Sequence, residues 1–172
     1  MEFRTLKANE IDCRIATINE KGLTLLLYKD ARVDQNILDE TVGKMNWQRK
    51  HCRDNANCIV SIWDAEKQQW IEKEDTGTES FTEKEKGLAS DSFKRACFNW
   101  GIGRELYSAP FIWISADDAN IRQGGNGKFQ CFDKFIVEQI IYDNERNIAA
   151  ISIKNTKTNK RVFLMDNRKK ES

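Results

Sequence analysis

Two adjacent cations and an aromatic ring stand close together in residues 89–104, ASDSFKRACFNWGIGR. On an α-helix, which turns about 100° per residue, Lys94, Arg95 and Phe98 fall on the side opposite to the apolar residues. Outward cations can hold phosphate groups, and a phenyl ring can stack on a nucleobase. This side is therefore a candidate for nucleic-acid binding. The alternative is a solvated surface on which Asp91 pairs with Lys94 and Arg95.

Other cations gather elsewhere in the chain. Arg49, Lys50 and Arg53 belong to residues 44–53, a stretch that contains no acid, and residues 167–172 form a basic tail. Either cluster is a candidate surface for an anionic partner, with a solvated surface as the alternative.

The segment GIGR at 101–104 is a weak candidate for a phosphate-binding loop. Such a loop precedes a helix and carries a further glycine where this chain has Leu106, whereas GIGR follows a predicted helix. Gly101 is explained more simply as the residue that ends the helix. Arg104 remains a candidate phosphate contact.

Composition limits the class of protein. The length of 172 residues suits one domain over residues 1–172, and 40% hydrophobic with 32% charged residues is typical of a globular protein. A net charge of +1 gives no overall basic character, so a nucleic-acid site would have to be local. The N-terminus lacks the apolar core of a signal peptide, and no apolar run approaches the roughly 18 residues of a membrane span. We expect a cytoplasmic protein without a membrane partner.

Cysteine usage points to a reducing compartment. The five cysteines include no CxxC pair, which predicts free thiols. His51, Cys52 and Cys58 lack a fourth ligand at the spacing that a zinc site needs. We therefore expect neither a metal nor a cofactor.

Hydrophobic periodicity and turn residues predict the following elements. Strands are expected at 13–17, 23–28, 58–63, 69–73, 111–114, 129–142, 147–154 and 161–165, and residues 75–80 are turn-like. Helices are expected at 33–42, ended by Gly43, and from about 82 to 100, with Thr82 and Glu85 as a capping box. This order predicts the α+β class: a mostly antiparallel β-sheet with a short helix and one long helix packed on it, followed by a C-terminal β-meander.

Four pieces of the sequence, in order, resemble a known family. They are ARVDQNILDETVGKMNW at 31–47, a β-hairpin, EDTG at 74–77 and DSFKRACFNWG at 91–101. This set is similar to the Rad fifty-two / Rad twenty-two family of single-strand annealing proteins, in the short form encoded by phages and prophages. The resemblance covers residues 25–110, the expected annealing core of β-β-β-α type. Residues 128–166, a C-terminal β extension, lie outside it.

The resemblance implies a function. Proteins of this family bind single-stranded DNA in a basic groove between a β-hairpin and a helix, assemble into rings or filaments, and anneal complementary strands without ATP in homologous recombination and DNA repair. It implies a homo-oligomer in a bacterial host cell that is not an enzyme, with a host single-stranded DNA-binding protein as a further candidate partner.

Individual site residues follow from the same resemblance. Lys94 and Arg95 match the lysine and arginine that hold the DNA backbone, and Arg32 falls near the arginine that lines the groove. A third helix arginine of the eukaryotic members falls at Phe98, so Arg104 or the cluster at 44–53 would have to replace its contact. The segment between EDTG and DSFKRA is shorter than in those members, so ring size does not carry over.

Other readings of the sequence stay open. A passive single-stranded DNA-binding protein built on an OB-fold would suit the strands and aromatics. A metal-dependent nuclease would use Asp75, Glu79, Glu83 and Glu85, although acids are also favoured at a helix N-terminus. An assembly or regulatory protein without a DNA groove is a further possibility.

The tryptophans have two interpretations. Trp47, Trp63 and Trp70 are favoured as sheet core, with base stacking as the alternative for the hairpin pair.

Overall fold

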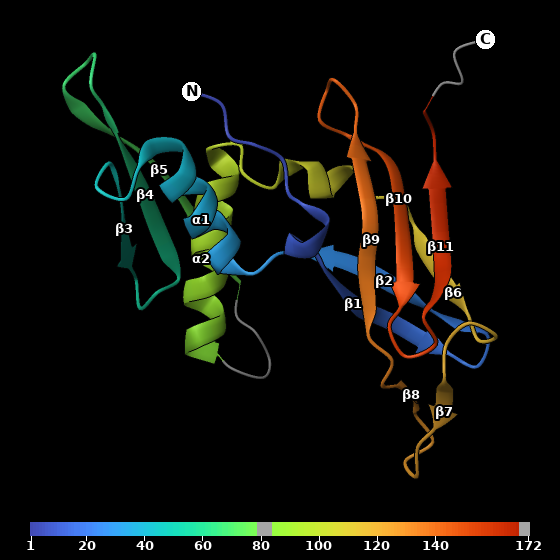
Figure 1. Ribbon diagram of the computed structural model, residues 1–172. Coiled ribbons are helices and arrows are strands. Elements are labelled where there is room, and N and C mark those ends of the chain that lie inside the picture. The colour runs from blue at the N-terminus through green and yellow to red at the C-terminus, as the bar shows by residue number, and fades with distance from the viewer. Residues whose placement is uncertain (79–83, 169–172) are drawn as a thin grey trace. The chain divides into compact units, whose positions relative to one another are not determined.

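The computed structural model describes residues 1–78 and 84–168 of the chain. These residues divide into two compact units (Figure 1). The first unit comprises Met1–Arg4 and Asp30–Arg104, and the second comprises Thr5–Lys29 and Glu105–Ser172. The predicted core at 25–110 corresponds mostly to the first unit, and the predicted extension at 128–166 belongs to the second. No helix in the described part of the chain is long and apolar enough to cross a membrane.

The first unit is a three-stranded antiparallel sheet covered by two α-helices. Its elements in chain order are α1 (Ala31–Val42), β3 (Trp47–Cys52), β4 (Asn57–Asp64), β5 (Gln69–Thr76) and α2 (Lys84–Asn99), and the sheet order is β3-β4-β5. The Asp30 side chain accepts a hydrogen bond from the backbone of Arg32 at the start of α1, and Gly43 ends the helix at φ 85°. The predicted short helix, β4–β5 hairpin and long helix are confirmed.

Two details of the first unit differ from the prediction. Strand β3 was not predicted, because WQRKHC shows no alternation of apolar and polar residues. The expected turn at 75–80 is wrong at its start, because β5 continues to Thr76. The predicted cap of the long helix at Thr82 lies outside the described residues.

The second unit is a β structure with two short 3₁₀ helices at its borders. Its strands are β1 (Asp12–Asn19), β2 (Gly22–Tyr28), β6 (Ile112–Ser115), β7 (Ile121–Gln123), β8 (Phe129–Cys131), β9 (Phe135–Tyr142), β10 (Ile148–Asn155) and β11 (Lys160–Asp166). The 3₁₀ helices are η1 (Ala8–Glu10) and η2 (Arg104–Ser108). The large sheet has the antiparallel order β11-β10-β9-β1-β2-β6, and β7 pairs with β8 in a separate hairpin. The α+β class and the C-terminal β-meander are therefore confirmed.

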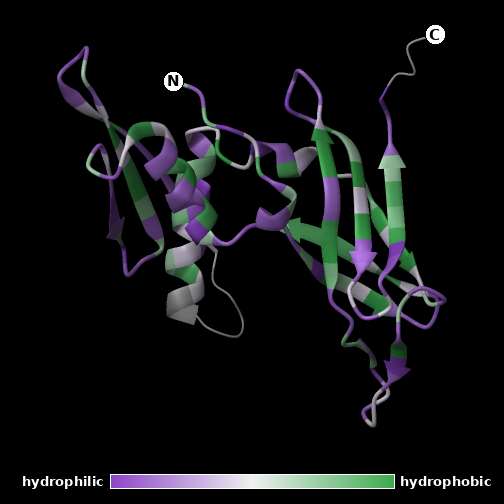
Figure 2. Cartoon of the chain, viewed as in Figure 1, coloured by the Kyte–Doolittle hydropathy of each residue, from purple (hydrophilic) through white to green (hydrophobic). Residues whose placement is uncertain are grey.

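The core of the second unit is formed by alternating side chains of the large sheet. Leu25, Ile114, Val137 and Ile153 are buried, and the two outermost strands, β6 and β11, contact each other. The sheet therefore curls around its own apolar side. In Figure 2, hydrophobic and hydrophilic bands alternate along these strands, and the turns between them are mostly hydrophilic.

The predicted single strand at 129–142 is interrupted at residues 132–134. Asp133 lies in this break, and its buried carboxylate accepts hydrogen bonds from the backbone of Asn120 and the side chain of Asn155. A carboxylate turned inward in this way cannot be recognised from hydrophobic periodicity.

Candidate nucleic-acid interface

Helix α2 packs on one side of the β3-β4-β5 sheet. Because strand side chains alternate, Cys58, Val60 and Ile62 all point toward this side, and each is buried. Phe93 of α2 is fully buried against them and stacks on Trp47 of β3, with ring centroids 6.1 Å apart. Burying a phenylalanine contributes about 1.5–3 kcal/mol, so this contact fixes which side of α2 faces outward.

The EDTG segment brings the end of β5 and the residue after it close to the backbone of α2. A Cβ at Gly77 would lie 2.6 Å from the backbone nitrogen of Ser92 and 2.9 Å from the carbonyl oxygen of Leu88. Only glycine fits between these backbone atoms without displacing the helix. Nearby, the Asn99 side chain donates to the Glu74 carbonyl at 2.9 Å. The segment therefore docks the hairpin on the helix.

Lys94 and Arg95 diverge from each other on α2. Arg95 is exposed, and its Nε lies 3.5 Å from Oδ1 of Asp75 in β5. Lys94 is half-buried, and its charge is one of the causes that lower the pKa of Asp30, which precedes α1. On α2, Arg95 therefore lies toward β5, and Lys94 lies toward the start of α1.

Asp91 does not neutralise this pair of cations. Its Oδ2 accepts from the backbone nitrogen of Thr78 at 2.9 Å and from the Thr78 hydroxyl at 3.2 Å. The alternative interpretation, in which Asp91 pairs with Lys94 and Arg95, is therefore wrong within the described residues.

Arg32 lies in the first turn of α1 and is paired with Asp30. Its Nε donates to Oδ1 at 3.0 Å and its Nη2 donates to Oδ2 at 3.1 Å. These hydrogen bonds, followed by the charge of Lys94, hold the pKa of Asp30 below its usual value. The Arg32 side chain is 82% exposed. One carboxylate therefore links Arg32 to Lys94, although the two cations are far apart in sequence.

Arg104 folds back over the last turn of α2. Its Nε donates to the Phe98 carbonyl at 2.8 Å, and its Nη2 donates to the Asn99 carbonyl at 3.0 Å. The guanidinium lies 5.4 Å from the centroid of the Phe98 ring, which is half-buried. Arg104 therefore satisfies carbonyl groups at the helix C-terminus while it remains beside Phe98.

The cations at 44–53 do not form one surface. Arg49 pairs with Val60 in the sheet register and so points toward α2, where its guanidinium lies 4.8 Å from the Phe93 ring centroid. Lys50 points to the other side of the sheet, and Arg53 lies in the β3–β4 turn at φ 51°. Arg49, Lys50 and Arg53 therefore do not form the single cluster that was expected to replace a phosphate contact.

The hairpin tryptophans lie on the side of the sheet away from α2. Trp63 and Trp70 are 36% and 38% exposed and meet edge to face with centroids 5.6 Å apart. The favoured interpretation as sheet core is wrong for this pair. Trp47 is half-buried, stacks on Phe93 and donates from its Nε1 to Asp39 of α1 at 2.7 Å.

Lys73 is a residue that sequence reasoning missed. Its Nζ donates to the Asn99 carbonyl at 2.9 Å and lies 4.6 Å from the Trp100 ring centroid. Strand alternation pairs Lys73 with Val60 and so places it on the side of α2, which is the signal that could have identified it.

The residues of the nuclease alternative are only partly described. Glu79, Glu83 and the side chain of Glu85 lie outside the described residues, and Asp75 contacts Arg95. Within the described part of the chain, no group of three His, Cys, Asp or Glu side chains is placed to hold a metal ion. His51 instead lies 3.4 Å from the Ser92 hydroxyl, and burial, followed by the charge of Arg49, lowers its pKa.

Comparison of the chain with family models, with curated proteins and with solved structures found no match.

Proposed function

We propose that this chain binds single-stranded DNA and anneals complementary strands without ATP, as an oligomeric ring or filament that serves recombination and repair. The observation that supports this proposal is that cations from three chain segments lie on and beside the outward side of α2. We call this surface the α2 outer face and define it by Arg32, Lys94, Arg95, Phe98 and Arg104. Three separate chain segments contribute to it. The chain order β3-β4-β5-α2 also agrees with the β-β-β-α core that the sequence resemblance implies.

The existing ion pairs are compatible with phosphate binding. Exposed pairs such as Arg32–Asp30 and Arg95–Asp75 contribute about 0–1 kcal/mol, so a phosphate can replace the carboxylate at small cost. Sequence-independent contacts to the backbone leave the base edges open to a second strand, which annealing requires. The half-buried ring of Phe98 offers a surface for a base.

Assembly follows from the small number of cations on the α2 outer face of each chain. The α2 outer face holds four cations, enough for only a few nucleotides of backbone. Several protomers would have to align these faces to hold a strand long enough for pairing, and assembly raises the effective concentration of each contact. Electron micrographs with and without single-stranded DNA test this step, and isolated monomers in both would contradict it.

The DNA-binding experiment compares two double variants of equal charge. Lys94→Gln with Arg95→Gln removes two cations of the α2 outer face, and Lys50→Gln with Lys67→Gln removes two elsewhere in the same unit. Anisotropy of a labelled oligonucleotide, measured over a range of salt concentrations, gives affinity and salt dependence. The first variant should bind about tenfold or more weakly and lower the slope of log K against log salt by about 1.4. Equal losses in both variants would refute the assigned face.

Annealing is measured separately from binding. Fluorescence energy transfer between complementary labelled strands should appear faster with the protein than without it, in the absence of ATP. A passive coating protein would instead slow pairing, and that result would replace the annealing function by simple strand binding.

A further inference from the structure

The β7–β8 hairpin of the second unit carries cations and amide side chains but no acid. Residues 119–132 read ANIRQGGNGKFQCF, and both cations among them, Arg122 and Lys128, are exposed. Figure 1 shows the hairpin projecting from the end of the large sheet at which the β10–β11 turn lies. A Cβ added at Gly125 or Gly127 would meet no atom within 4 Å, so the tip reaches into solvent. The proposed function does not use this positively charged hairpin.

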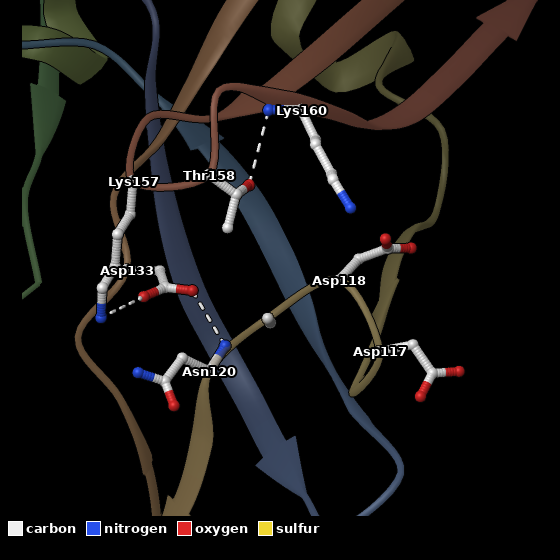
Figure 3. A pocket seen from close by; sticks show the side chains of 8 residues that line it. Asp117, Asp118, Asn120, Asp133, Lys157, Thr158 and Lys160 are labelled. Atoms are coloured by element: carbon white, nitrogen blue, oxygen red, sulfur yellow. Dashed lines mark hydrogen bonds and ion pairs between the residues drawn. The ribbon is translucent and has the colours of Figure 1, made fainter.

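A buried carboxylate closes the root of the hairpin. Asp133 follows β8, and its side chain is only 1% exposed. Its Oδ2 accepts from the backbone nitrogen of Asn120, which precedes β7, and from Nδ2 of Asn155 in β10, both at 2.9 Å. Figure 3 shows Asp133 between Asn120 and Lys157, whose Nζ lies 3.5 Å from Oδ1. These contacts tie both ends of the hairpin to the large sheet.

Hydrogen bonds also define the tip of the hairpin. The backbone nitrogen of Gly124 donates to the Lys128 carbonyl at 2.8 Å, and that of Lys128 donates to Oδ1 of Asn126 at 3.1 Å. Nε2 of Gln123 donates to the carbonyl of Gly127, which has a φ of 76° that favours glycine. A hairpin held at its root and at its tip can bind a partner without a large loss of conformational entropy.

The strand register places a guanidinium beside an amide. Arg122 and Gln130 are paired across the hairpin, so their side chains lie on the same side of it, and both are exposed. The Arg122 Nε donates to Oδ1 of Asn120 at 3.2 Å, which orients the guanidinium. Arginine and glutamine are side chains that make paired hydrogen bonds to the edges of guanine and adenine in the major groove of DNA.

We propose that the β7–β8 hairpin binds double-stranded DNA in the major groove, with Arg122 and Gln130 facing base edges and Lys128 contacting a phosphate. The major groove is about 12 Å wide and admits a two-stranded β-ribbon, whose strands lie about 4.8 Å apart. Single strands are typically held by successive stacked aromatic rings, and the side of the hairpin formed by Arg122 and Gln130 offers polar groups instead.

The residues at the root add to this surface. Lys134 and Phe132 stand on either side of Asp133 in the sequence, and both are exposed, Phe132 by 83%. A lysine there can hold a phosphate at the edge of the groove, and a phenyl ring can contact a thymine methyl group. The nearby acids Asp117 and Asp118 precede the hairpin, in the loop after β6, so they lie outside its two strands.

This inference goes beyond the annealing function and does not depend on it. The hairpin belongs to the second unit, whereas Lys94, Arg95 and Phe98 of the α2 outer face belong to the first. The two surfaces are assigned different ligands, duplex and single strand, so each can be tested while the other is left intact.

The first experiment changes only the ligand. A short labelled DNA duplex is bound to the full chain and followed by fluorescence anisotropy, and unlabelled DNA and RNA duplexes of the same sequence and length compete for it. The major groove of an RNA duplex is too deep and narrow for protein side chains to read. The RNA duplex should therefore compete about tenfold or more weakly than the DNA duplex. Equal competition by the two duplexes, or no binding of the DNA duplex at low salt, would overturn the proposal.

The second experiment changes the protein. Arg122→Gln with Lys128→Gln is compared with Lys50→Gln and Lys67→Gln, which remove the same charge from the first unit. The hairpin variant should bind the DNA duplex about tenfold or more weakly, and the slope of log K against log salt should fall by about 0.9 for the lost phosphate contact. The control pair should bind the duplex as the unchanged protein does. Equal losses in the two variants would refute the assigned hairpin.

The same variants separate this inference from the annealing function. Binding of a labelled single strand should be unchanged in the hairpin variant and reduced in Lys94→Gln with Arg95→Gln, and duplex binding should show the opposite pattern. A hairpin variant that loses both ligands equally would refute a duplex site. Duplex binding that depends on the hairpin, in a chain that does not speed annealing, would refute the annealing function alone.

Discussion

The substitution Asp75→Asn tests whether Arg95 is available to bind DNA or serves only to dock β5 on α2. The Arg95 Nε and the Asp75 Oδ1 are 3.5 Å apart, and the side chains are 46% and 29% exposed. At that separation two unit charges interact by about 1 kcal/mol in a water-like dielectric, and measured exposed pairs contribute about 0–1 kcal/mol. Because both side chains reach solvent, screening by salt reduces the Coulomb energy between Arg95 and Asp75 further.

The carboxylate of Asp75 competes with a phosphate for the same guanidinium. If Arg95 holds DNA, Asp75→Asn should tighten binding by at most about fivefold, which corresponds to about 1 kcal/mol. The gain should shrink as salt rises, because exposed charges are screened over about 10 Å at 0.1 M ionic strength. Stability should fall only slightly, since the Asn oxygen can still accept from the Thr76 backbone, as Asp75 does at 2.7 Å.

Glu72→Gln is the matched control. Glu72 lies on the same strand but points to the opposite side of the sheet, and its substitution changes the net charge equally. Anisotropy with a labelled oligonucleotide gives both affinities, and urea unfolding gives both stabilities. If Asp75→Asn binds no more tightly than Glu72→Gln while losing more stability, Arg95 is a docking residue and its assigned contact with DNA is refuted.

Three further expectations follow from the first unit. Gly77→Ala should lower the free energy of unfolding by about 1–3 kcal/mol, because its Cβ would meet helix backbone at 2.6 Å and 2.9 Å. Gly125→Ala is the control in the same urea-unfolding measurement; a Cβ there meets no atom within 4 Å, so its stability should be close to that of the unchanged protein. The pKa of His51 is lowered in the folded protein, so between that pKa and about pH 6.5 the unfolded chain binds more protons than the folded chain. The free energy of unfolding should therefore decrease as the pH falls through this range. This pH dependence should vanish in His51→Gln, which removes the chain's one histidine. Phe98→Ala should weaken oligonucleotide binding by about 1–3 kcal/mol and cost less stability than Phe93→Ala, whose fully buried ring should cost about 3–5 kcal/mol; similar stability losses in the two variants would identify Phe98 as core.

Periodicity predicted most elements but not β3, whose side toward α2 carries polar groups. Residues 58–63 alternate clearly enough to give β4 and its inward side. The residues of β3 on the side of α2 are Trp47, Arg49 and His51, and two of these are cationic or polar. They are accommodated by ring contacts and a hydroxyl group of α2, which are tertiary interactions. A pattern based on hydropathy therefore could not have found this strand.

The sequence predicted which side of α2 each residue lies on, but not which residues of other elements it contacts. Helical spacing gave Phe93 and Ala96 to the core and Arg95 to the outside, as the structure has them. The partners of Asp91 and Arg95 come from the end of β5 and the residues after it, at sequence separations that local spacing does not reach. The same holds for Asp133, whose partners Asn120 and Asn155 meet only in the folded sheet.

Two motifs of the resemblance, EDTG and the α2 segment, form the two sides of one contact. EDTG supplies the Glu74 carbonyl, the Asp75 carboxylate and the space at Gly77, and the α2 segment supplies Asn99, Arg95 and the backbone around Ser92. Packing alone therefore accounts for finding both motifs in one chain. Lys94 and Arg32 do not belong to this contact; Arg32 pairs with Asp30, and the charge of Lys94 is among the causes that lower the pKa of Asp30. Their loss should weaken DNA binding without loosening the hairpin, so variants of these two cations test the proposed function separately from the packing of the motifs.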